Sequence, residues 1–183
     1  MEHIKHQKKN RIINRVTEIV TEGGLPKTGQ MMVYQMGDDG YYQMGYPIGG
    51  GQRFIDNGDG TVVDMATGLM WIKDPQAVGL GMTMYWYDAI NACENLFHAG
   101  HDDWRLPNIN ELMSIVDHSR YNPAFDTMFF VPAPDTWTPY WSSTICAPWP
   151  DGAWCLYPYD GYKTSWGRPY DMCFVRPVRG GRS

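Results

Sequence analysis

The chain has 183 residues, 43% of them hydrophobic, which suits one domain with an extension and a real core. Its net charge of −5 gives no broad basic field and disfavours a nucleic-acid partner, and no apolar run approaches the roughly 20 residues that would predict membrane insertion. The 20 glycines, 13 prolines and 14% aromatic residues favour turns and short strands over long helices.

The N-terminal extension, residues 1–24, is basic at its start and lacks the apolar region of a secretory signal, so the location of the protein stays open. A helical stripe over residues 10–22 predicts a short helix that ends at Gly23, although the many Val and Ile residues leave a strand as the alternative. A helix this short is marginal alone, so we expect it to dock on the domain or on a second copy of the chain. The apolar positions of the stripe are Ile12, Ile13, Val16, Ile19 and Val20.

Residues 25–52 predict an ordered surface coil, and residues 53–72 predict strands joined by tight turns. The segment Asp56-Asn57-Gly58-Asp59-Gly60 contains Asn-Gly and Asp-Gly, which supply the positive φ angles of a hairpin. A calcium loop is the weaker interpretation, because its third position needs an oxygen ligand and Gly58 has none.

Two helices follow. Residues 84–98 carry the strongest helical pattern, with Gly100 placed where the helix would stop. A second helix begins at Asn108, a good N-cap, and Glu111 completes a capping-box pair. From residue 122 onward we expect loops and short strands. The predicted buried faces are Trp86, Ala89, Ile90, Cys93, Leu96 and Phe97 for the first helix, and Ile109, Leu112, Ile115 and Val116 for the second.

No catalytic residue, cofactor or metal is predicted. The four cysteines fit no zinc spacing, and buried thiols are favoured over disulfides. His98 and His101 beside two aspartates could hold a metal, but histidines at a helix end more often cap carbonyls. The hydroxyls of Ser142-Ser143-Thr144 have no histidine downstream, so they are expected to bond backbone.

The segment Asp103-Trp104-Arg105-Leu106-Pro107 predicts a packed corner, with the Trp in the core and the Arg on a carboxylate or carbonyls. Together with other spaced motifs it resembles the C-terminal domain of the Legionella collagen-like adhesin over residues 25–181. The other motifs are Phe54-Ile55-Asp56-Asn57-Gly58-Asp59-Gly60-Thr61-Val62, Ala66-Thr67-Gly68-Leu69-Met70-Trp71, Asn108 with Glu111-Leu112, Tyr140-Trp141-Ser142-Ser143-Thr144 and Val175-Arg176-Pro177-Val178-Arg179-Gly180.

That resemblance implies an α+β domain over residues 25–183 with a C-type lectin fold: two helices, a small twisted antiparallel sheet and long irregular loops. It also implies a ligand-binding role for the segment at about 137–176. Some members are adhesin domains. Others are variable proteins of diversity-generating retroelements, including those of archaea and their viruses, in which a reverse transcriptase rewrites adenine-containing codons near the C-terminus. The calcium ligands of sugar-binding C-type lectins are not matched here, since Trp149-Pro150-Asp151 is a different sequence.

If the chain is a variable protein of this kind, the genetic code limits which of its C-terminal residues can vary. A mutagenised AAY codon does not yield Trp, Met or Lys, so Trp141, Trp154 and Trp166 are expected to belong to the fixed scaffold, together with the other tryptophans of the segment. The residues compatible with variation, and expected to contact a protein or cell-surface ligand, are Ile145, Ala147, Pro148, Asp151, Tyr157, Tyr159, Tyr162, Arg168, Tyr170 and Asp171.

Three functions follow from these observations. The first is a ligand-binding display protein with a diversified, Tyr-rich face and no enzymatic role. The second is an invariant adhesin or virion structural domain of the same fold. The third, a remote alternative, is an enzyme that uses Cys146 and Cys155, which stand nine residues apart.

Overall fold

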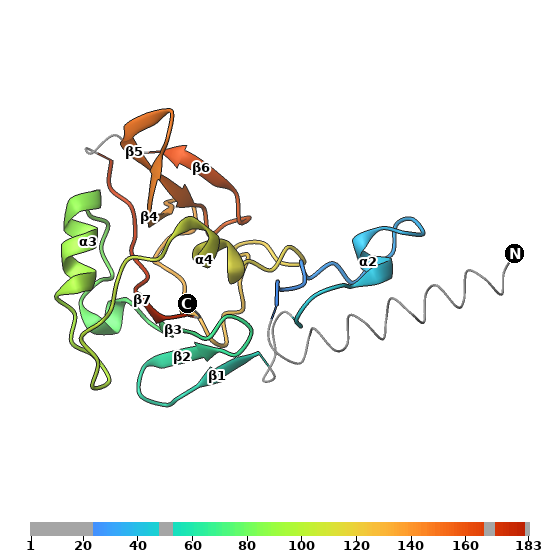
Figure 1. Cartoon of the computed structure of the whole chain (residues 1–183), viewed down its shortest axis with the longest axis horizontal. Coiled ribbons are helices and arrows are strands. Elements are labelled where there is room, and N and C mark those ends of the chain that lie inside the picture. The colour runs from blue at the N-terminus through green and yellow to red at the C-terminus, as the bar shows by residue number, and fades with distance from the viewer. Residues whose placement is uncertain (1–23, 48–52, 167–170, 182–183) are drawn as a thin grey trace, which may run out of the picture.

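The computed structural model describes residues 24–47, 53–166 and 171–181. In those ranges the chain forms two small antiparallel sheets and a few short helices, so the predicted α+β class is confirmed. Figure 1 shows the three-stranded sheet at the top and the four-stranded sheet at the bottom, with α4 between them and α3 along one side. The helix predicted within residues 10–22 lies outside the described residues.

The four-stranded sheet has the order β1-β2-β3-β7. Its strands are β1 (Phe54–Asp56), β2 (Thr61–Asp64), β3 (Leu69–Ile72) and β7 (Val178–Gly180). The hairpin turn predicted between β1 and β2 is confirmed: Gly58 and Gly60 have φ angles of 77° and 88°, and the Asp56 carboxylate accepts from the Gly58 N–H at 2.9 Å. The sheet thus joins the first strands of the domain to its last one.

The three-stranded sheet has the order β4-β5-β6, with β4 (Tyr140–Cys146), β5 (Trp149–Leu156) and β6 (Lys163–Trp166). Cys146 pairs with Trp149, so the turn between β4 and β5 contains only Ala147 and Pro148. Leu156 pairs with Lys163, which leaves a longer loop at the opposite end of the sheet. The expected run of loops and short strands after residue 122 is therefore confirmed.

The helices are α2 (Asp39–Tyr42), the 3-10 turn η1 (Gln76–Val78), α3 (Trp86–Glu94) and α4 (Ile109–Ser114). The capping box of α4 is confirmed, and the four residues predicted for its buried face are buried. The coil predicted over residues 25–52 contains α2, which begins at Asp39 because the carboxylate of Asp38 caps it by accepting from the Tyr41 N–H. We call residues 24–47 the arm.

The end predicted for α3 is wrong. The helix stops at Glu94, because the side chain of Asn95 donates to the Asn91 carbonyl at 2.7 Å and closes the last turn. Phe97 is therefore 73% exposed rather than on the buried face. Gly100, with φ 78°, belongs to a separate turn in which the backbones of His98 and His101 pair.

Two hydrophobic clusters form the core. The larger one joins the four-stranded sheet to α4 and to the phenylalanines of residues 125–130, and the smaller one packs α3 against β4 and β5. All four cysteines are buried free thiols, as predicted. Two arginines are also buried: Arg53 pairs with Asp64 at 2.7 Å, and Arg176 donates to the Ile72 and Lys73 carbonyls.

Candidate ligand-binding surface

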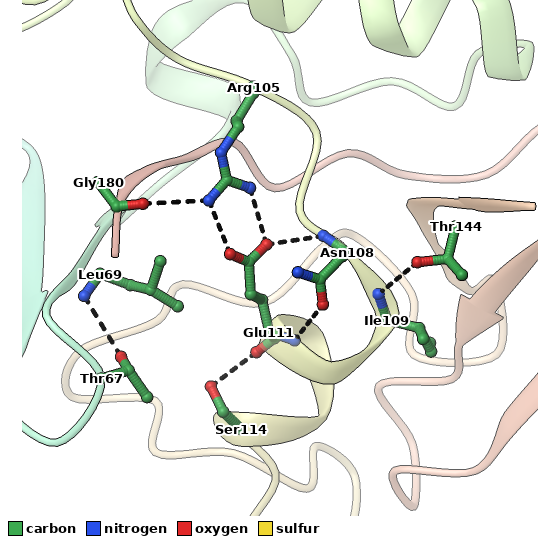
Figure 2. A network of polar contacts seen from close by, with 9 residues as sticks. All are labelled: Thr67, Leu69, Arg105, Asn108, Ile109, Glu111, Ser114, Thr144 and Gly180. Carbon is green, nitrogen blue, oxygen red and sulfur yellow. Dashed lines mark hydrogen bonds and ion pairs between the residues drawn. The ribbon is translucent and has the colours of Figure 1, made fainter. Parts of the chain in front are cut away.

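The site rests on a frame of polar contacts around Arg105 (Figure 2). Its guanidinium forms two hydrogen bonds of 2.7 Å to the Glu111 carboxylate and a third, of 3.1 Å, to the Gly180 carbonyl. The same carboxylate accepts from the Asn108 N–H at 2.7 Å, while the Asn108 side chain accepts from the Glu111 N–H at 2.9 Å. The Arg105–Glu111 pair thus links the corner to the start of α4 and to Gly180 in β7.

The frame extends into the three-stranded sheet. The hydroxyl of Thr144 in β4 accepts from the Ile109 N–H at 3.0 Å, so β4 is fixed to the first turn of α4 (Figure 2). The Ser142 hydroxyl donates to the Trp154 carbonyl at 2.6 Å. Both hydroxyls bond backbone, as the sequence predicted.

The predicted corner is confirmed as well. Trp104 is 1% exposed and fills the core, and the backbones of Arg105 and Val178 exchange two hydrogen bonds of 2.9 and 3.0 Å. Next to it, Arg179 donates to both carboxylate oxygens of Asp103, which lowers the pKa of that carboxyl. The motifs that carry the family resemblance therefore build the scaffold.

The β4–β5 hairpin carries four of the ten predicted contact residues. Ala147, Pro148 and Asp151 are exposed, and Ile145 exposes 40% of its surface beside an irregularity in the strand register. Trp149, next to the turn, is 67% exposed. These residues lie in or next to the turn between β4 and β5, and Figure 1 shows the end of this hairpin at the top.

The loop between β5 and β6 carries three more. Tyr157 closes it by donating its N–H to the Tyr162 carbonyl at 2.8 Å. The loop is fixed to the segment at 122–124, since the Tyr159 carbonyl accepts from the Asn122 N–H at 2.6 Å and the Pro158 carbonyl accepts from the Ala124 N–H at 2.8 Å. These backbone hydrogen bonds hold the loop against the body of the domain.

An aromatic cluster covers this loop. The Tyr159 ring stacks on Trp137, with centroids 4.2 Å apart and planes at 19°, and meets Tyr121 edge-on at 6.3 Å. Trp137 is 68% and Tyr121 75% exposed. Tyr157 and Tyr162 lie in the same loop with ring centroids 6.4 Å apart, and burial raises the pKa of Tyr157. We call these five residues the loop surface: Tyr121, Trp137, Tyr157, Tyr159 and Tyr162.

The predicted contact residues therefore form two groups. β4 has seven residues, about 20 Å of strand, and separates the hairpin end from the loop surface. Asp171 is half-buried beyond β6, whereas Arg168 and Tyr170 lie outside the described residues. The predicted contact residues in the described ranges therefore do not form one continuous surface.

The prediction that the tryptophans of the segment are scaffold is correct for Trp141, which is fully buried, and is supported by Trp154, which packs on the larger core cluster. It is wrong for Trp137 and Trp149, which are exposed because neither faces a core cluster. The side chain of Trp166 is outside the described residues. Sequence reasoning also missed Tyr121, because only the fold brings it to Tyr159.

The remaining candidate chemistry has little geometric support. Cys155 pairs with Trp141 while Cys146 pairs with Trp149, so the two cysteines stand about 15 Å apart along the hairpin and form no thiol pair. Burial raises the pKa of Cys93 to about 12, and a hydrogen bond with Cys155 together with burial raises that of Cys173, so both thiols stay protonated.

In the described ranges, no group of three His, Cys, Asp or Glu residues is arranged to hold a metal ion. None of the helices in those ranges has the length and apolar character that a bilayer span requires.

Fold and surface together define an α+β domain with a polar frame around Arg105 and exposed aromatic residues. The Lcl C-terminal domain model matches residues 60–179, and the chain belongs to that adhesin-like family. No curated protein matches the chain.

Proposed function

We propose that this chain is a ligand-binding display protein: a C-type lectin scaffold over residues 25–183, preceded by an extension over 1–24, whose surface within about 137–176 is diversified by a retroelement of an archaeon or an archaeal virus. Its partner is a protein or cell-surface ligand. Membership of an adhesin-like family supports binding to such partners. Helices α3 and α4 beside antiparallel strands support the scaffold.

The observation that carries the proposal is the separation of fixed and replaceable residues. Arg105, Glu111 and Thr144 are engaged in the frame by hydrogen bonds of 2.7–3.0 Å. Ala147, Pro148 and Asp151 are exposed at the hairpin end and contribute to neither core cluster. Substitution at such exposed positions typically changes the free energy of unfolding by less than about 0.5 kcal/mol. A surface of this kind can be rewritten without unfolding the domain.

Binding itself is supported by the loop surface. Tyr and Trp side chains give large contact areas at low entropic cost, and rigid aromatic anchors dominate the energy of many interfaces. The Tyr159 backbone is bonded to Asn122, and its ring packs against those of Tyr121 and Trp137. The side chain therefore loses little conformational entropy when it contacts a partner. Asp160, exposed in the same loop, supplies a charge at the rim.

The encoding locus tests the diversification. We expect a reverse transcriptase gene and a near-identical template repeat of the segment that encodes residues 137–176, with mismatches at adenines. A locus with neither would overturn this part of the proposal while leaving the adhesin-like domain intact.

One observation favours an invariant adhesin or virion structural domain instead. Trp137 cannot arise from a mutagenised AAY codon, and Tyr121 lies outside the segment at 137–176, yet both are part of the loop surface. A fixed aromatic surface fits an invariant ligand. The same surface sequence in several isolates, with no template repeat, would support this second function.

A further inference from the structure

The arm exposes apolar side chains at a high density. Large hydrophobic residues along it leave between 38% and 86% of their surface exposed. Monomeric soluble proteins rarely expose contiguous apolar patches beyond a few hundred Å². The exposed residues are Leu25, Met31, Met32, Val33, Tyr34, Met36, Tyr41, Tyr42 and Met44.

The arm nevertheless has a defined internal structure. The Asp38 carboxylate accepts hydrogen bonds from the backbone N–H groups of Tyr34, Gln35 and Tyr41 at 2.9–3.3 Å, and from the Gln30 side chain at 3.0 Å. These bonds lower the pKa of Asp38. Its neighbour Gly40 packs so tightly that a Cβ there would stand 2.1 Å from the Met32 carbonyl oxygen. A bonded structure of this kind orders the apolar side chains in one arrangement.

The arm joins the body of the domain beside two grooves. The His118 N–H donates to the Thr28 carbonyl at 2.7 Å, and Gly29 adopts φ 97° against Asp117. One groove at this joint, of about 560 Å³, is lined in part by Met31, Met32 and Tyr34. A second groove, of about 480 Å³, is lined in part by Leu25, Met113 and Val116, and both grooves share Thr28 and His118. Both grooves offer apolar walls to a partner.

We propose that the apolar surface of the arm binds a second copy of this chain. The charged side chains of the arm are Lys27, Asp38 and Asp39 alone, so few like charges would face one another in a pair of arms. At on the order of 100 Å² for each of the nine exposed side chains, the arm carries enough apolar surface for the roughly 800 Å² per partner of a standard interface. An isologous pairing requires such a self-complementary patch.

The pairing would leave the hairpin end of the domain free. Figure 1 shows the arm and α2 projecting on the side opposite α3, well away from the turn between β4 and β5. Two copies joined at their arms would carry two hairpin ends in one particle, and linked binding sites gain avidity without new contacts. The self-pairing does not depend on the proposed function and can fail or hold independently of it.

Sedimentation velocity of the full chain tests the proposal. The variant Met32→Gln with Met36→Gln removes two arm side chains that are 66% and 80% exposed, so it should fold normally. The matched control is Met82→Gln with Met128→Gln, two methionines that are 78% and 75% exposed outside the arm. Native circular dichroism spectra of both variants verify the fold.

We expect the wild type and the control to associate at micromolar concentration, and the arm variant to dissociate at concentrations at least about tenfold higher. A wild-type chain that stays monomeric up to about 100 µM would overturn the proposal and indicate a different partner. An arm variant that associates as tightly as the control would also overturn it and would locate the interface elsewhere.

Discussion

Tyr159 and Trp137 form a stacked pair with ring centroids 4.2 Å apart, although they come from different loops. The Trp137 ring remains 68% exposed, so the pair adds rigidity to the surface without adding to the core. Under the proposed function, this pair offers aromatic area to a ligand, while the hydrogen bonds around Arg105 and the buried core stabilise the domain. The separate roles of the exposed aromatic residues and of the stabilising contacts can be measured.

Trp137→Ala should cost about 1 kcal/mol of unfolding free energy, because it removes one aromatic pair from an exposed site. Trp104→Ala, at a core position that is 1% exposed, should cost about 3–5 kcal/mol. Urea denaturation followed by fluorescence measures both variants. A loss at Trp137 as large as that at Trp104 would mean that the stacked pair is structural.

Arg105→Lys should destabilise the domain by about 1–2 kcal/mol although it keeps the charge, because an ammonium group cannot make the paired bonds to Glu111 and also reach Gly180. Arg120→Lys is the control, since that side chain is 46% exposed and should change stability by less than about 1 kcal/mol. Equal midpoints of urea denaturation for the two variants would contradict a stabilising role of the Arg105 hydrogen bonds.

Stability should fall at acid pH. Hydrogen bonds from Arg179 lower the pKa of Asp103, and those from Lys73 lower the pKa of Asp56. Since the unfolded carboxyls bind protons more readily, this stability is complete above their ordinary pKa of about 3.9 and is lost as the pH falls through the lower folded values. Thermal melts between about pH 5 and pH 2 measure it, and Asp103→Asn should show a shallower decline. A melting temperature that rises on acidification would contradict this linkage.

The thiols should be unreactive in the folded protein. All four are buried, and the Cys93 pKa of about 12 keeps that thiol protonated at pH 8. A chromogenic disulfide reagent should therefore detect almost no thiol in the native protein and all four after denaturation. Rapid native labelling would show an accessible thiolate and would revive a cysteine-dependent activity.

Local features were predictable from the sequence because their causes are local. The hairpin turn at Asp56–Gly60 follows from glycines at positive φ, and the capping box follows from Asn108 and Glu111 three residues apart. The end of α3 was missed because the Asn95 side chain closes the last turn before the apolar pattern is exhausted. Helix α2 was missed since it depends on one carboxylate, that of Asp38, collecting bonds from several directions.

The candidate surface was only partly predictable for a different reason. The sequence singled out Tyr159 as a contact residue, which stays a prediction, but its neighbours Tyr121 and Trp137 come from other loops and meet it only in the fold. The codon argument also suggested that the tryptophans form the scaffold, whereas the exposure of each tryptophan depends on whether its side chain faces a core cluster. Such long-range proximity has no signature in residue spacing.

The most direct test of the account is the sequence of this domain in many isolates. The account predicts substitutions concentrated in adenine-derived codons at the hairpin and loop positions, above all Ala147, Asp151 and Tyr162, with Arg105, Glu111 and Trp141 unchanged. Substitutions spread evenly over the surface, without regard to codon, would contradict diversification and leave an invariant adhesin-like domain.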